Sequence, residues 1–148
     1  NVIATFQPRM NKVISAESAN KMLVLLQGVV DGGTAGRLRY KYNFEGEIGG
    51  KTGTTNNNSD AWFIGFTPQL VSGVWVGGED RDIHFDNMAM GQGATMALPI
   101  WAYFMRKVYN DRTLGYSSKV KFDLPDGFDP CKNQDNDSSS NQIDEVYE

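Results

Sequence analysis

Residues 48–77 read IGGKTGTTNNNSDAWFIGFTPQLVSGVWVG and decide the expected fold. They contain three segments with strand character, at 48–55, 61–66 and 70–77, which are rich in β-branched and aromatic residues. The polar run NNNSD and the turn TPQ separate these segments. Because links this short cannot contain a crossover helix, we expect the three strands to pair antiparallel as a meander.

Two further segments have the period of an amphipathic helix. The first begins after Ser15, a good N-cap residue, and is expected to end at the glycines 32–33. The second spans 96–109, and its apolar stripe is expected to face the core. The residues that form this stripe are Ala97, Trp101, Phe104, Met105 and Val108. Residues 34–46 and 78–94 lack a clean period, and we expect loops there.

These elements predict an α+β fold, in which an antiparallel sheet is covered on one face by two helices. Residues 1–14 are rich in apolar side chains and are interrupted by Pro8, which suggests extended structure. The run 132–140 is too polar to fold on its own. We therefore expect one domain over 1–130, followed by a polar, disordered tail over 131–148.

Composition and charge argue against several functions. The formal net charge is -4 and the basic residues are scattered along the chain, so the sequence has no cluster of positive charge of the kind that binds nucleic acid. The longest apolar stretch, 22–30, is far shorter than the roughly 20 residues that a membrane span needs. Cys131 is alone and cannot form an internal disulfide, and His84 is expected in a surface loop rather than a metal site. We expect no cofactor and no metal.

The candidate chemistry lies in the sequence GGKTGTT at 49–55. Because residues two apart share one face of a strand, Thr52 and Thr54 would present two hydroxyls side by side, and Gly53 would remove bulk between them. Such a pair suits a carboxylate, and Lys51 adds the positive charge that a carboxylate requires. The backbone N–H of Thr54 could stabilise a developing oxyanion. The strand could bind and polarise a substrate, but it contains no nucleophile with an activating base.

Two other interpretations of this strand compete. A lysine and two threonines on an antiparallel strand could simply form a solvated face. Alternatively, the sequence GEIGGKT at 46–52 looks like a phosphate-binding loop. It has one residue too few between its outer glycines, and no predicted helix follows it to present an N-terminus to phosphate. A nucleotide site is therefore not expected.

Several stretches, taken together, form a more specific pattern. The sequence GKTGTT at 50–55 is followed at once by DAWFIGFTP at 60–68. The accompanying stretches are VISAESA (13–19), LQGVV (26–30), GTA (33–35), GVWVG (73–77) and ALPIW (97–101). In this combination the chain resembles the class A penicillin-binding proteins, the bifunctional peptidoglycan synthases, from about residue 13 to residue 110.

The resemblance implies the C-terminal portion of a penicillin-binding, β-lactamase-like transpeptidase domain. In that family a serine attacks the penultimate D-alanine carbonyl of a stem peptide and passes the acyl group to a neighbouring stem, and β-lactams trap the acyl-enzyme. Carried over to this chain, Lys51 would orient the catalytic hydrogen-bond network and the substrate charge. Thr52, Gly53, Thr54 and Thr55 would form the substrate-binding strand, with the Thr54 N–H as half of the oxyanion hole.

The same resemblance places the serine, its lysine and a Ser-x-Asn motif upstream of this chain, in the missing N-terminal part of the domain. The sequence SANK at 18–21 matches Ser-x-x-Lys, but it aligns with a helix that precedes the KTG strand, and we interpret Ser18 as a chance match. The isolated chain is therefore expected to be inactive. In an alternative interpretation, the chain is a non-catalytic module that senses cell-wall peptides or β-lactams.

The implied partners are peptidoglycan stem peptides, β-lactams and the missing part of the same domain. The family works at the periplasmic face of the bacterial inner membrane, which this chain would reach only through an anchor outside it. A sheet without its remaining strands and helices exposes an unpaired edge and apolar surface, which predicts self-association of the isolated chain.

Overall fold

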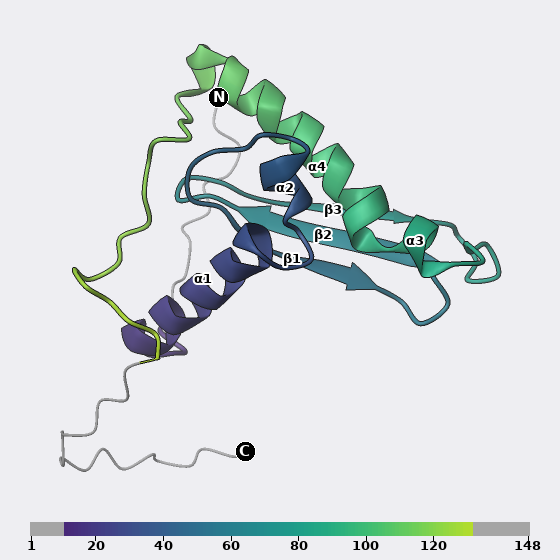
Figure 1. Ribbon diagram of the computed structural model, residues 1–148, viewed down its shortest axis with the longest axis horizontal. Helices are drawn as coiled ribbons and strands as arrows, with labels where there is room; N and C mark the ends of the chain where they lie inside the picture. The colour runs from purple at the N-terminus through teal and green to yellow at the C-terminus, as the bar shows by residue number, and fades with distance from the viewer. Residues whose placement is uncertain (1–10, 132–148) are drawn as a thin grey trace, which may run out of the picture.

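The computed structural model describes residues 11–131, which form an α+β fold (Figure 1). Three strands, β1 (Gly49–Thr54), β2 (Asp60–Phe66) and β3 (Val71–Gly77), form one antiparallel sheet in the order β1-β2-β3. Each strand begins and ends within one residue of its predicted bounds. The predicted meander is confirmed.

The first helix, α1 (Ala16–Asp31), has the caps that the sequence predicts. The side-chain oxygen of Ser15 accepts a hydrogen bond from the Ser18 N–H at 3.0 Å. At the other end, the Gly32 N–H donates to the Gly28 carbonyl oxygen at 3.1 Å. Two ordinary capping interactions thus fix where the chain enters and leaves this helix.

Two short helices lie in the segments for which the sequence predicts loops. The helix α2 (Arg37–Tyr40) buries Leu38, and α3 (Met88–Gly91) begins after Asn87, whose side-chain oxygen accepts from the Met90 N–H at 3.0 Å. Each is about one turn long and so shows no apolar period in the sequence. The Asn87 cap was the one local signal for α3.

The long helix α4 (Gly93–Asn110) starts three residues earlier than predicted. Four of the five residues expected on its buried stripe are buried, whereas Phe104 is 45% exposed. Phe104 follows Trp101 by three residues, which places it about 60° around the helix and at the margin of the stripe. The expectation for Phe104 was therefore wrong. A short 3-10 helix, η1 (Arg112–Leu114), follows α4.

The helices cover one face of the sheet. Helix α1 packs on β1, and α4 packs on β2 and β3 (Figure 1). Side chains along β2 alternate accordingly: Phe63 is fully buried, while Trp62 and Ile64 on the other face are about half exposed. The fully buried residues of the core are Val30, Ala35, Leu38, Ile48, Phe63, Ala97, Leu98, Trp101, Ala102 and Met105.

Other expectations concern the ends of the chain. Extended structure was predicted for residues 1–14, of which 1–10 lie outside the described residues and 11–14 belong to no helix or strand. Of the tail predicted for 131–148, residues 132–148 lie outside the described residues. Cys131, the last described residue, is an exposed free thiol. Between residues 11 and 131, the helices lack the length and apolar character that crossing a membrane requires.

Candidate functional site

Strand β1 is an edge strand of the sheet formed by the described residues. The Thr55 N–H just beyond it donates to the Asp60 carbonyl oxygen at 3.1 Å. Opposed pairs in an antiparallel ladder alternate between hydrogen-bonded and non-hydrogen-bonded. The backbone groups of Thr54 and Thr52 therefore point away from β2, toward the free edge. The Thr54 N–H points out of the sheet at this edge, where it can donate a hydrogen bond to an oxyanion.

The side chains of Thr52 and Thr54 lie on one face of β1. Thr52 is opposite Phe63 and Thr54 is opposite Ala61, and both partners are buried on the helix-covered face. Thr52 is half-buried and Thr54 is exposed, so both are at the accessible margin of that face. The two hydroxyls thus stand side by side at the edge of the sheet.

Each of these hydroxyls has a hydrogen-bond partner outside β1. The Thr52 hydroxyl lies 2.9 Å from the Thr34 hydroxyl, which comes from the turn after α1. The Thr54 hydroxyl oxygen accepts from the N–H of Gly93, the first residue of α4, at 3.1 Å. The turn after α1 and the first residue of α4 therefore each contribute a group that contacts the threonine pair.

Lys51 is exposed and reaches the same edge. Its ammonium group donates to the Thr52 carbonyl oxygen at 2.7 Å. By the alternation of the strand its side chain leaves from the face opposite the threonine hydroxyls, and the long stem brings the charge back to the free edge. A fixed positive charge beside two hydroxyls and a free N–H favours an anionic ligand.

Gly53 and Thr55 have different environments from the hydroxyl pair. A Cβ at Gly53 would lie 3.1 Å from Trp62 Cβ, so the glycine relieves crowding on the uncovered face of the sheet. The Thr55 hydroxyl accepts from the Asp60 N–H at 2.9 Å and lies 3.0 Å from the Ser59 hydroxyl. Thr55 therefore closes the turn between β1 and β2.

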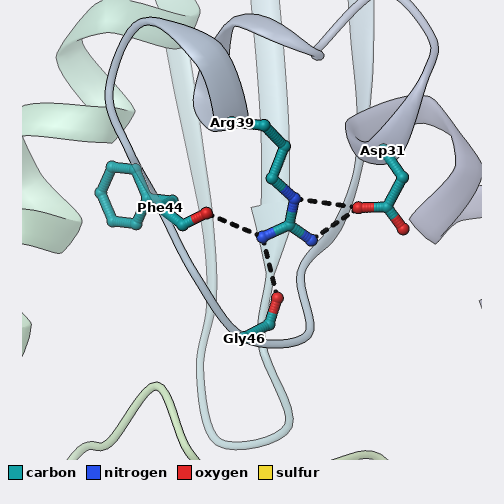
Figure 2. Close-up of polar contacts among 4 residues, drawn as sticks. All are labelled: Asp31, Arg39, Phe44 and Gly46. Carbon is teal, nitrogen blue, oxygen red and sulfur yellow. Dashed lines mark hydrogen bonds and ion pairs between the residues drawn. The ribbon is translucent and has the colours of Figure 1, made fainter.

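The loop that leads into β1 is held by Arg39 (Figure 2). Its Nη1 donates to the carbonyl oxygens of Phe44 at 3.0 Å and Gly46 at 2.9 Å. Its Nε and Nη2 both donate to one carboxylate oxygen of Asp31, at the last residue of α1. Because one side chain joins α1, α2 and this loop, the position of β1 relative to α1 is fixed.

Sequence reasoning missed three residues in and next to this site, Thr34, Arg37 and Gly93. The Nη1 of Arg37 donates to the Ala94 carbonyl oxygen at 3.3 Å and to the Thr95 hydroxyl at 3.1 Å. This places a second cation beside the first turn of α4. Thr34 lies in the GTA stretch at 33–35, which was noted only for its family resemblance.

Two alternatives from the sequence have no support in the geometry. Ser18 is in the first turn of α1, and Lys21 forms an ion pair with Glu17 at 2.7 Å rather than contacting the serine. His84 is exposed, and residues 11–131 contain no group of three or more His, Cys, Asp or Glu side chains that could hold a metal ion.

Comparison with known proteins identifies the relatives of this chain. No protein-family model matches it. Penicillin-binding protein 1A of Rickettsia bellii is 40% identical over 115 residues, which are 77% of this chain and 13% of that protein. Penicillin-binding protein 1A of Pseudomonas aeruginosa is 36% identical over 115 residues, which are 74% of this chain. Most of this chain is homologous to penicillin-binding protein 1A.

The fold supports the same relationship. A crystal structure of penicillin-binding protein 1A from Haemophilus influenzae matches with a TM-score of 0.62 and 31% sequence identity, over 77% of this chain and 17% of that one. The resemblance to class A penicillin-binding proteins is therefore confirmed, and the α+β fold corresponds to part of penicillin-binding protein 1A. The chain spans about 13% of the length of these curated relatives.

Proposed function

We propose that this chain supplies the substrate and oxyanion strand of a D,D-transpeptidase that cross-links peptidoglycan stem peptides and is acylated by β-lactams. The observation that carries the proposal is the free edge of β1 in a homologue of penicillin-binding protein 1A. Two hydroxyls, one ammonium group and one outward backbone N–H meet there. These donors match a ligand with a terminal carboxylate next to a reactive carbonyl.

Each residue has a separate role in this proposal. The hydroxyls of Thr52 and Thr54 donate to the terminal carboxylate of the stem peptide, and Lys51 provides the compensating charge. The Thr54 N–H donates to the carbonyl oxygen as it becomes an oxyanion, which is where such a donor accelerates acyl transfer. Gly53 avoids the crowding that a Cβ would cause against Trp62, and Thr55 holds the end of the strand through its hydrogen bond with Ser59.

The nucleophile is assigned to another segment of the same domain. A serine hydroxyl there would attack the penultimate D-alanine carbonyl, forming the ester bond as the amide bond breaks and terminal D-alanine leaves with the proton. The amine of a neighbouring stem peptide then displaces the serine and forms the cross-link. This chain would bind and polarise the carbonyl in both steps, so by itself it is expected to be inactive.

The location follows from the same family. We place this strand, within the complete protein, at the periplasmic face of the bacterial inner membrane, where stem peptides are available. The partners are then stem peptides, β-lactams and the segment that contributes the serine. Neither nucleic acid nor a bound cofactor has a role in this reaction.

The test is covalent labelling with a fluorescent penicillin. The longer polypeptide that contains this segment should be labelled, and Thr52→Val with Thr54→Val should greatly slow the labelling. The chain of 148 residues alone should not be labelled. Serine-dependent labelling of the isolated chain would overturn the assignment of the nucleophile. Reversible penicillin binding without acylation of the longer polypeptide would instead support a non-catalytic sensing module.

A further inference from the structure

The hydroxyls of Thr52 and Thr54 share one feature of their hydrogen bonding. Each has a hydrogen-bond partner from a segment outside β1, Thr34 for Thr52 and Gly93 for Thr54. A threonine hydroxyl has one hydrogen to donate and two lone pairs that accept. Which way that hydrogen points decides whether the hydroxyl can donate to an anion.

The direction is determined for Thr54. The Gly93 N–H can only donate, so it occupies a lone pair of the Thr54 oxygen and leaves the Thr54 hydrogen free. The N–H also belongs to the first residue of an 18-residue helix, where unpaired N–H groups carry partial positive charge. The Thr54 hydroxyl is thus polarised as a donor, and its hydrogen is available to a ligand.

For Thr52, the partner can be either donor or acceptor, since both groups are hydroxyls 2.9 Å apart. When an anion accepts the single hydrogen of Thr52, only the hydrogen of Thr34 remains to fill their shared hydrogen bond. The chain then runs from the Thr34 hydroxyl to the Thr52 hydroxyl to the anion. Consecutive hydrogen bonds of this kind strengthen one another.

The turn that carries Thr34 is well fixed. The Ala35 N–H donates to the Val29 carbonyl oxygen at 2.9 Å, and the Ala35 side chain is fully buried. The Gly36 N–H donates to the Gly33 carbonyl oxygen at 3.0 Å. Thr34 itself is exposed, so its hydroxyl is presented to β1 by a rigid turn and contributes little to the core.

We propose that Thr34 is a positioning residue, which orients the Thr52 hydroxyl as a hydrogen-bond donor to the carboxylate of the substrate, as the Gly93 N–H does for Thr54. The inference rests on the proposed function, because it assigns the threonine pair a carboxylate ligand. Thr34 does not contact the substrate. Its effect should therefore appear only with ligands that carry the carboxylate.

The experiment compares benzylpenicillin with its methyl ester in the longer polypeptide that contains this segment. Thr34→Val removes the hydroxyl and keeps the shape, and it should lower the second-order acylation rate constant for benzylpenicillin about tenfold. With the methyl ester the change should be no more than about twofold, since the ester lacks the charge that the hydroxyl chain stabilises. Thr34→Ser, which keeps the hydroxyl, should acylate like the unchanged protein.

Thr113→Val is the matched control, because it removes a hydroxyl that bonds Asp111, away from β1. It should leave both rate constants unchanged. An equal loss with acid and ester after Thr34→Val would show a structural role and overturn the inference, as would no loss with either. If the unchanged protein is not acylated at all, the proposed function itself fails, which is a distinct result.

Discussion

Arg39 donates two hydrogen bonds to a single carboxylate oxygen of Asp31, from Nε at 2.9 Å and from Nη2 at 2.6 Å (Figure 2). The remaining nitrogen, Nη1, donates to two carbonyl oxygens of the loop before β1. The planar guanidinium therefore connects the end of α1 to the start of the candidate site. A lysine side chain has only three N–H donors, all on one nitrogen, and could not make these four bonds, which the planar guanidinium distributes over three nitrogens.

Arg39→Lys should lower the free energy of unfolding by roughly 1–2 kcal/mol, because carbonyl groups of the loop lose their donor while the charge is kept. We expect only a modest destabilisation, because the Arg39 side chain is 27% exposed and solvent weakens its charge interactions. Urea denaturation measures the change. The matched control is Arg112→Lys at an exposed position in η1, which should have almost no effect. Equal midpoints for the two variants would contradict the role given to Arg39.

Gly93→Ala should destabilise the protein, because a Cβ there would lie 2.3 Å from the Trp62 carbonyl oxygen and 2.7 Å from that of Gly53. Both atoms are backbone, so α4 must move away from the sheet, at a cost of about 1–3 kcal/mol. Gly73→Ala is the control, since its Cβ would make an ordinary contact with Ile64 at 3.5 Å. Urea denaturation should separate the two variants clearly, and a stable Gly93→Ala variant would show that the helix has room to shift.

Lys51→Ala should reduce β-lactam acylation of the longer polypeptide by about a hundredfold, the usual effect of removing one electrostatic donor from an acyl-transfer site. Lys51 is exposed, so its removal should hardly change the unfolding midpoint. Lys119→Ala removes an exposed lysine elsewhere and should acylate normally. Acylation of Lys51→Ala at the unchanged rate would remove Lys51 from the site.

Most of the fold could be predicted from the sequence, because its signals are local. Three segments rich in β-branched and aromatic residues are joined by short polar links, and links of that length are compatible only with an antiparallel meander. Ser15, as an N-cap residue, indicated the start of α1. The helices α2 and α3 were missed since about one turn has no period. The start of α4 was also misplaced, as Gly93 is a poor helix former whose position depends on contacts with β1 and β2.

The candidate site could be predicted only in part. Residues within β1 follow from the period of a strand, which places Thr52 and Thr54 on one face. The contacts from Thr34, Arg37 and Gly93 join residues 18 to 58 positions apart, and no pattern in the sequence indicates such pairs. The Arg39 bonds that hold the loop before β1 are likewise visible only once the chain is folded.

Self-association of the isolated chain stays a prediction, and the uncovered face of the sheet is where we expect it. Trp62 and Trp75 pack against each other there at 6.4 Å between ring centroids, yet each is nearly half exposed. Ile64 and Val71 add exposed apolar surface on the same sheet. Contiguous apolar surface of this kind associates in water because association removes it from solvent.

Trp62→Thr combined with Ile64→Thr keeps residues that favour strands but removes much of this apolar surface. In sedimentation velocity the unchanged chain should show a mass that rises with concentration, and the double variant should remain closer to the monomer. Ile100→Gln removes a residue that is 50% exposed on α4 and should leave the association unchanged. A chain that is monomeric at every concentration, or one in which Ile100→Gln has the same effect as the double variant, would contradict an association through the sheet face.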